Sequence, residues 1–205
     1  MKLYYAPGAC SLSPHIALRE AGQAFDLEKV DLKAKKTASG EDFAAVNPKG
    51  YVPALRLDNG DVLTEASTIV QYVAGKKPEA RLAPVAGTPE RYRLQEWLNF
   101  IATEVHKGTS PLFNPATPDA YKQMATDRLG QRYDYLAKEL AKKPYLMGEN
   151  FTVADGYLFT ILNWANFVKI DLGKWPALQA YQARVAARPA VQAALKAEGL
   201  LKAAA

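Results

Sequence analysis

The chain has 205 residues, of which 49% are hydrophobic, 10% aromatic and 23% charged, an average composition that excludes disordered, collagen-like and low-complexity proteins. Its net charge is +5, and the basic excess lies after residue 80 without more than two adjacent basic residues, which favours solubility or an anionic small ligand over nucleic acid. No segment has the length and apolar character of a signal peptide or a membrane span, so we expect a cytoplasmic protein that binds no membrane.

Strands and helices alternate in the structure predicted for the first 76 residues. A strand over residues 2–6 precedes a helix that begins at Ser13, the expected N-cap with Pro14 after it, and ends near Gly22. A second strand is expected over residues 25–32. The segments that follow are a helical piece over 39–46, a hairpin with strands 54–57 and 62–64 around Asn59-Gly60, and a helix over 64–74. The order β-α-β-α-β-β-α indicates a small α/β domain.

Only helices are predicted after the exposed connection at residues 83–87. They are expected over residues 89–107, 119–141, 153–168, 176–187 and 190–198. Pro111, Pro115 and Pro118 are expected to form a loop between the first two helices. The sequence therefore predicts an α/β domain over residues 1–80 and an all-helical (all-α) domain over residues 88–205.

The helix predicted to begin after Thr152 has the signature of a capping box. Asp155 stands three residues after the threonine, so each side chain can satisfy the other residue's backbone amide. The hydrophobic staple that usually accompanies such a box would pair Phe151 with the residue four after the cap, but that residue is Gly156. We interpret the box as a structural feature.

Three features of the first domain carry a resemblance: one cysteine after the first strand, a Val-Pro pair before the third, and Glu-Ala-Ser at the start of the last helix. The chain resembles the glutathione transferases over its whole length, with a thioredoxin-like domain followed by a helical one. The segments Gly8 to His15 and Asn47 to Leu55, with a histidine at position 106, are similar to the bacterial beta class, which uses cysteine where other classes use tyrosine or serine. The chain also resembles members encoded with aromatic-pollutant degradation, some of which remove chlorine from aromatic acids.

Cys10 is the only cysteine of the chain and so cannot form an intramolecular disulfide. Ser13 stands where a thioredoxin would carry its second cysteine, so a mixed disulfide with glutathione would persist until a second glutathione attacks it. A position just before a helix favours a thiolate. The alternative is a packed, inert thiol. The resemblance implies that Cys10 is catalytic and contacts glutathione.

The resemblance implies that five further residues of the first domain bind glutathione. They are Lys35, Val52, Glu65, Ala66 and Ser67. Val52 would pair with the cysteinyl backbone, and the bond to the proline after it would be cis. Glu65 suits the α-ammonium group, the amides of the helix start and the Ser67 hydroxyl suit the γ-glutamyl carboxylate, and Lys35 suits the glycyl carboxylate. The structural alternatives are a plain hairpin entry at Val52, an N-cap at residues 65–67 and a solvated loop at Lys35.

A polar stripe is predicted on the helix over residues 89–107. Asn99, Thr103 and His106 are spaced by four and three residues, with Glu104 beside them, and solvent exposure alone explains most such stripes. The resemblance implies instead that the stripe lines the active-site cleft. All four residues would then contact glutathione. His106 would be catalytic near the thiol, and Asn99 and Glu104 would reach the glutathione of the partner subunit, which implies a homodimer.

Aromatic residues late in the chain could form either core or the roof of a substrate pocket. Tyr157, Trp164 and Phe167 are the candidates, and the resemblance implies that Trp164 faces the cleft. Two histidines and one cysteine offer too few soft ligands for a metal site, so we expect no metal.

The function expected from these residues is that of a detoxifying glutathione transferase, with glutathione as co-substrate. It would activate the glutathione thiol for conjugation to apolar electrophiles and for exchange with disulfides. Three alternatives remain open: a glutathione-dependent dehalogenase of chlorinated aromatic acids, a non-catalytic member that binds ligands or proteins, and a nucleic-acid-associated protein.

Overall fold

The computed structural model describes residues 1–201 and divides the chain into two units. The first unit joins Met1–Ala83 to the C-terminal segment from Ala187, and the second unit is Pro84–Ala186. This division differs from the expected domains at the end of the chain, because the expected helical domain includes the segment after Ala187. No helix among the described residues is long and apolar enough to cross a membrane.

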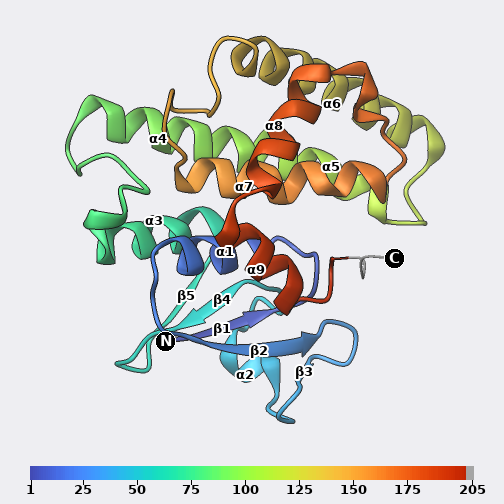
Figure 1. The fold of residues 1–205 in the computed structure, drawn as a ribbon. Helices are drawn as coiled ribbons and strands as arrows, with labels where there is room; N and C mark the ends of the chain where they lie inside the picture. The colour runs from blue at the N-terminus through green and yellow to red at the C-terminus, as the bar shows by residue number, and fades with distance from the viewer. Residues whose placement is uncertain (202–205) are drawn as a thin grey trace. The chain divides into compact units, whose positions relative to one another are not determined.

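The first unit is built on a five-stranded mixed sheet with the strand order β3-β2-β1-β4-β5. The strands are β1 (Lys2–Tyr5), β2 (Asp26–Asp31), β3 (Lys36–Thr37), β4 (Ala54–Arg56) and β5 (Val62–Thr64). β1 lies parallel to β2 and antiparallel to β4, and β4 and β5 form the predicted hairpin (Figure 1). The sequence analysis does not predict β3, which is two residues long and pairs with Val30 and Asp31 of β2.

Helices cover both faces of this sheet. They are α1 (Leu12–Glu20), α2 (Phe43–Val46), α3 (Ala66–Lys76) and α9 (Pro189–Ala197), with the short 3-10 helix η1 (Pro78–Ala80). α1 and α3 lie on one face and α2 on the other (Figure 1). Tyr4 and Ala54 pack with Phe43 of α2, while their neighbours Leu3 and Leu55 are fully buried on the opposite face. The alternation of side chains along each strand thus builds one core on each side.

Helix α1 begins two residues earlier than predicted, with Ser11 rather than Ser13 as its N-cap and Leu12 rather than Pro14 as its first residue. The Ser11 hydroxyl bonds to the end of β1, accepting from the Ala6 amide at 3.1 Å and donating to the Ala6 carbonyl at 3.2 Å. Pro14 therefore lies third in the helix, where an amide has no intrahelical partner in any case. The prediction of Ser13 as the cap was wrong, because the contact of Ser11 with the strand sets the start of the helix.

Helix α9 belongs to the first unit because it packs on α1. Val191 and Ala194, spaced by three residues, are fully buried, and Arg188 just before the helix donates two hydrogen bonds to Glu20 at 2.6 and 2.8 Å. Figure 1 shows α9 beside α1. The helix itself was predicted within one residue, whereas its packing partner was not.

The second unit is helical, as predicted. Its elements are α4 (Pro89–Phe100), the π-helix η2 (Ile101–His106), α5 (Lys107–Phe113), α6 (Asp119–Leu140), α7 (Val153–Leu162), α8 (Pro176–Ala186) and the 3-10 helices η3 (Asn163–Asn166) and η4 (Leu172–Lys174). The first predicted helix continues through Pro111 to Phe113 and changes to a π-helix on the way, so the loop begins later than the prolines suggested. The helix predicted over 153–168 ends as a 3-10 turn.

Helix α7 is buried along its whole length, and the predicted capping box at its start is confirmed. Asp155 accepts hydrogen bonds from the amides of Thr152 and Leu146, both at 2.8 Å. The missing staple is compensated by a different contact, since the Phe151 ring packs edge-to-face against Tyr145 at 5.9 Å. The box therefore anchors the preceding loop as well as the helix.

Candidate active site

The only cysteine lies in the loop between β1 and α1. Cys10 is half-buried, and its thiol donates a hydrogen bond to the carbonyl oxygen of Val52 at 3.3 Å. The loop is closed on itself, because the Leu12 amide donates to the Ala9 carbonyl at 3.0 Å and the Ser11 hydroxyl bonds to the end of β1. The thiol is therefore held at a fixed place directly before a helix.

Val52 is the second predicted site residue that the structure brings to this place. The peptide bond between Val52 and Pro53 is cis, which confirms the expectation from the resemblance. The side chain of Val52 is buried, and within residues 1–201 its amide donates no hydrogen bond. A backbone donor and the carbonyl that faces the thiol thus remain side by side for an extended peptide ligand.

The loop from Asn47 to Pro53, here termed the 47–53 loop, is organised by a residue that the sequence analysis does not single out. Asn47 is buried, and its side-chain amide donates to the Tyr51 carbonyl at 2.7 Å. Its side-chain oxygen accepts from the Lys49 amide at 3.1 Å, and its backbone carbonyl accepts from the Gly50 amide at 2.8 Å. The Asn-Pro pair at the start of the loop was the available signal in the sequence.

Glu65 lies directly before α3 with a φ of 68°, a conformation that is rare for a residue with a side chain. Its carbonyl accepts hydrogen bonds from the amides of Thr68 and Ile69. By contrast, the amides of Ala66 and Ser67 and the Ser67 hydroxyl have no hydrogen-bond partner within the described residues. Together they form a set of donors at the positive end of a helix, which suits a carboxylate.

The carboxylate of Glu65 bonds to two side chains of the 47–53 loop. Lys49 Nζ and the Tyr51 hydroxyl both donate to Glu65 Oε1 at 2.8 Å. The hydrogen bond to Glu65 raises the pKa of Lys49, since it favours the ammonium form. The same carboxylate raises the pKa of Tyr51, because ionisation would remove the proton that Tyr51 donates to it and would place two negative charges together. Sequence reasoning missed Lys49 and Tyr51.

Lys35 approaches the same loop from the turn after β2. Its ammonium group donates to the Gly50 carbonyl at 2.6 Å, and the residue has a φ of 55°. The 47–53 loop therefore contacts Lys35, Cys10 and Glu65 through four of its residues. The structure thus gathers the predicted site residues of the first unit around a single loop.

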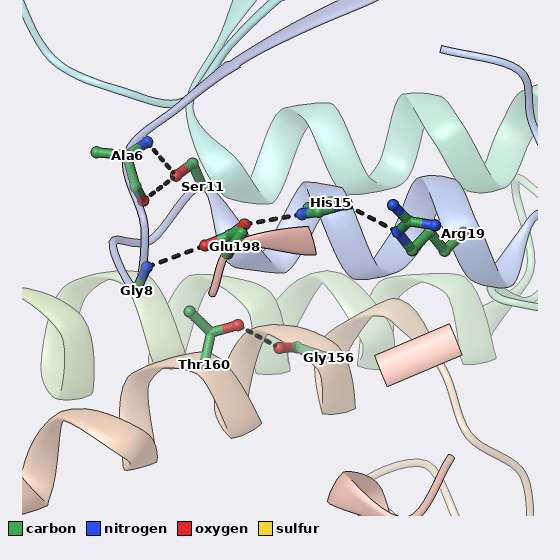
Figure 2. Close-up of polar contacts among 8 residues, drawn as sticks. All are labelled: Ala6, Gly8, Ser11, His15, Arg19, Gly156, Thr160 and Glu198. Atoms are coloured by element: carbon green, nitrogen blue, oxygen red, sulfur yellow. Dashed lines mark hydrogen bonds and ion pairs between the residues drawn. The ribbon is translucent and has the colours of Figure 1, made fainter. Parts of the chain in front are cut away.

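A buried polar network ties this region to the end of α9 (Figure 2). Glu198 Oε2 accepts from the Gly8 amide at 2.9 Å, two residues before the cysteine, and Glu198 Oε1 lies 2.8 Å from His15 Nδ1. Arg19 Nε donates to His15 Nε2 at 2.8 Å. Because a guanidinium only donates, Nε2 of His15 is the acceptor and Nδ1 carries the proton that it donates to Glu198. Glu198 is a further residue that sequence reasoning missed.

The second unit contains His106 at the last position of the π-helix. Its Nδ1 lies 2.7 Å from the Tyr157 hydroxyl, and its ring meets the Trp164 ring edge-to-face at 4.9 Å. The Phe113 ring also meets the Trp164 ring edge-to-face, at 5.3 Å. Trp164 is buried, Tyr157 lies in the core, and Phe167 is exposed. His106 and Trp164 thus share one aromatic cluster.

The remaining residues of the polar stripe lie on α4 and the π-helix. Asn99 and Thr103 are exposed, and the Thr103 hydroxyl donates to the Asn99 carbonyl at 3.0 Å. The Glu104 carboxylate pairs with Arg132 at 2.7 Å and lies 3.9 Å from Arg128. Thr103 and Glu104 line a cavity of about 290 Å³ with residues of α5 and α6. π-Helices are rare overall, and many of those that do occur lie at functional sites. The sequence carries no pattern that predicts one.

No group of three or more histidine, cysteine, aspartate or glutamate side chains suited to a metal ion is found in the part of the chain that the structure describes.

Comparison with known proteins gives consistent matches over both units. The model of the glutathione S-transferase N-terminal domain matches residues 8–76, and that of the glutathione S-transferase C-terminal domain matches residues 100–189. The chain is 49% identical to glutathione S-transferase GstA of Escherichia coli O157:H7, over 98% of this chain and 100% of the relative.

Solved structures of bacterial enzymes are similar over the same length. A ternary complex of BphK, a bacterial GST, is 59% identical with a TM-score of 0.96, covering 98% of this chain and 100% of that one. A sphingomonad glutathione S-transferase complexed with glutathione is 51% identical, with a TM-score of 0.95 and the same coverage. A bacterial beta class enzyme of Sphingomonas chungbukensis is 52% identical, with a TM-score of 0.95 and coverage of 98% and 100%.

Proposed function

This chain belongs to the glutathione S-transferase family and is a glutathione transferase, and on that premise we propose that it works by the cysteine chemistry of the bacterial beta class. The observation that carries the proposal is the Cys10 thiol, held before α1 within hydrogen-bond distance of the Val52 carbonyl. The sphingomonad relative that contains glutathione supports glutathione as the co-substrate.

Glutathione would bind along the 47–53 loop and the start of α3. The unused Val52 amide and the Val52 carbonyl suit the backbone of the cysteinyl unit, which places the glutathione thiol beside Cys10. The amides of Ala66 and Ser67, with the Ser67 hydroxyl, suit the γ-glutamyl carboxylate. The carboxylate of Glu65 suits the α-ammonium group. In the same proposal Lys35 would pair with the glycyl carboxylate.

Disulfide exchange would proceed in two steps at Cys10. The Cys10 thiolate attacks the glutathione sulfur of a disulfide, forms a mixed disulfide and releases the other half as a thiolate. A second glutathione thiolate then attacks the bound glutathione sulfur, which regenerates the Cys10 thiolate and forms oxidised glutathione. Because the chain has one cysteine, no internal disulfide competes with the second step.

Conjugation uses the thiolate of bound glutathione itself, which attacks an electrophilic carbon of the substrate and displaces its leaving group. The positive end of α1 would stabilise that thiolate. We assign His106 to proton exchange at the thiol and Trp164 to the substrate pocket, and their shared cluster supports a common role. Glutathione-dependent removal of chlorine from aromatic acids remains the rival activity.

A homodimer in the cytoplasm, acting in detoxification, is part of the proposal. Large apolar side chains are exposed on α4 and α6 of the second unit, and a partner subunit would cover them. They include Tyr92, Tyr121, Met124 and Tyr135. Asn99 and Glu104 would then reach the glutathione of the partner subunit, and Thr103 would contact glutathione beside them. Sedimentation velocity is expected to give twice the mass of one chain, and a monomer would contradict this part.

Retention and turnover test the function itself. The purified chain is expected to bind immobilised glutathione and to elute with free glutathione. It is also expected to accelerate both the conjugation of an activated aryl halide and the reduction of a glutathione mixed disulfide. Retention without either turnover would contradict the proposed cysteine chemistry. Release of chloride from a chlorinated aromatic acid with neither of the other activities would favour the dehalogenase.

A further inference from the structure

Glu65, the residue proposed to bind the α-ammonium group of glutathione, already holds an ammonium group from its own chain. Lys49 Nζ lies 2.8 Å from Glu65 Oε1 and 3.0 Å from the hydroxyl oxygen of Thr64. The Tyr51 hydroxyl donates to the same oxygen of Glu65 at 2.8 Å. A ligand cation that binds this carboxylate must therefore compete with Lys49.

The contact between Lys49 and Glu65 is built from both sides. The backbone of Lys49 is fixed by the buried Asn47, whose side-chain oxygen accepts a hydrogen bond from the Lys49 amide at 3.1 Å. Glu65 is fixed by its left-handed conformation and by the two helix amides that bond to its carbonyl. The pair thus differs from an ordinary surface ion pair such as Lys77 with Glu79. In that pair Nζ and Oε1 are 3.4 Å apart, and the two residues are only two positions apart in the chain.

The ion pair is nevertheless open enough to exchange. The side chains of Lys49 and Glu65 are 48% and 50% exposed, so water can replace either partner without burying an unpaired charge. The Thr64 hydroxyl gives Lys49 a second acceptor, which can keep the ammonium group nearby after it leaves Glu65. Lys49 can therefore leave Glu65 and return to it without an unpaired charge becoming buried.

We propose that Lys49 is a specificity-determining residue that occupies the ammonium subsite of Glu65 in the unliganded protein and yields it to glutathione. The inference rests on the glutathione site proposed above. When glutathione binds, one ammonium group replaces another on the same carboxylate, so the gain from this contact is small. When a ligand lacks the α-ammonium group, Lys49 stays in place and Glu65 keeps its counter-charge.

The consequence is a site that tolerates γ-glutamyl ligands without a free α-ammonium group. The wild-type protein is expected to bind glutathione and a deaminated analogue with similar affinity. Removal of the Lys49 charge reverses this tolerance, because Glu65 then loses the counter-charge of Lys49 and the ligand's ammonium group can take its place.

The test measures one ratio of affinities in four proteins. Calorimetric titration gives Kd for S-methylglutathione and for its deaminated analogue, in which hydrogen replaces the α-ammonium group and the blocked sulfur prevents thiol chemistry. The proteins are the wild type, Lys49→Met, the charge-preserving Lys49→Arg, and Lys77→Met as a matched control. The control removes one lysine from a surface ion pair of the same unit at the far end of α3.

In the wild type and in the Lys77→Met variant, the analogue is expected to bind within about threefold of S-methylglutathione, because one exposed ion pair replaces another. In Lys49→Met the ratio of the two Kd values rises at least about tenfold, because a charged hydrogen bond is gained only with the ammonium ligand. Lys49→Arg keeps the ratio of the wild type.

Two results would overturn the inference, and they differ from each other. A wild type that already rejects the analogue by about tenfold, with the same ratio in Lys49→Met, would show that Lys49 does not occupy the subsite. Binding of neither ligand to the wild type would remove the proposed glutathione site, and with it the inference.

Discussion

The hydrogen bond from the Cys10 thiol to the Val52 carbonyl joins two residues that are 42 positions apart in the chain. It brings the thiol to a backbone edge where a peptide can bind in extended form. Glutathione bound there would present its own sulfur, so the protein thiol is required only where a mixed disulfide forms. The two activities therefore depend on Cys10 to different degrees.

Substitution of Cys10 by alanine is expected to separate these activities. Disulfide exchange is abolished, whereas the Kd for S-methylglutathione changes by less than about tenfold, because the loop and the start of α3 still supply several hydrogen bonds of about 0.5 to 1.5 kcal/mol each. A coupled mixed-disulfide assay and calorimetry measure the two quantities. Undiminished exchange in Cys10→Ala would mean that the thiol only packs.

Asp155 is a residue whose titration links burial to stability. Complete burial raises the pKa of its carboxyl from 3.8 to about 6, although hydrogen bonds from Leu146 and Thr152 partly oppose the shift. The folded protein therefore binds this proton more tightly than the unfolded chain does. The stability that results is fully present below about pH 3.8 and is lost as the pH rises through about 6.

The size of this effect follows from the shift of about two pKa units, which corresponds to about 3 kcal/mol in the free energy of unfolding. Carbon NMR of the Asp155 carboxyl is expected to show a titration midpoint near 6. The free energy of unfolding in urea should show the matching decrease over the same pH range. A midpoint at or below 3.8 would show that the hydrogen bonds outweigh burial.

The sequence predicts which residues of the first unit gather at the site better than it predicts what they touch. Cys10, Val52 and Glu65 are identified through the resemblance, because their local positions alone also fit a packed thiol, a hairpin entry and an N-cap. The partners Lys49 and Tyr51 are not identified, because a polar residue in a loop has no period that says which way it faces. Glu198 is missed for another reason, since its partners lie at the opposite end of the chain.

At the scale of elements, the helix that carries His106 departs most from its prediction. Apolar periodicity and Thr88-Pro89 fix its start, and the Thr88 hydroxyl accepts from the Arg91 amide at 3.2 Å as an N-cap should. Its continuation through Pro111 follows a π-helical segment in which the hydrogen-bond register has already changed. A local rule that ends helices at proline could not take this change of register into account.

Helix α9 acts as a support for the loop that carries the thiol. Glu198, at the C-terminal end of α9, bonds through one carboxylate oxygen to Gly8 and through the other to His15 (Figure 2). Gly8 and His15 both donate to Glu198. The hydrogen bond from Arg19 to His15 Nε2 keeps the proton of the His15 ring on Nδ1. Each carboxylate oxygen therefore needs to be an acceptor.

Substitution of Glu198 by glutamine tests this support. The side chain keeps its size but presents an NH2 group to one of two donors, so the free energy of unfolding should fall by about 1 to 3 kcal/mol. Urea unfolding measures this change, and thiol alkylation kinetics should show a change in the reactivity of Cys10. The matched control Glu79→Gln alters an exposed carboxylate and should leave both unchanged within experimental error. Equal stability of Glu198→Gln and wild type would contradict the role.

For the molecule as a whole, the alternating and helical periods of the sequence are enough to predict an α/β unit and a helical unit. They do not predict where the last helix packs. The buried stripe of α9, with Val191 and Ala194, specifies an apolar partner without specifying α1. Long-range pairs such as Arg188 with Glu20 determine where α9 packs. No local sequence pattern identifies either residue as a partner of the other.

The central claim is that this glutathione transferase forms a covalent intermediate with glutathione at its single cysteine. Intact-protein mass spectrometry after incubation with oxidised glutathione tests it most directly. We expect one added glutathione on the wild-type chain, its loss after treatment with reduced glutathione, and no addition to Cys10→Ala. A wild-type chain that stays unmodified under these conditions would contradict the assignment of Cys10 as the catalytic thiol.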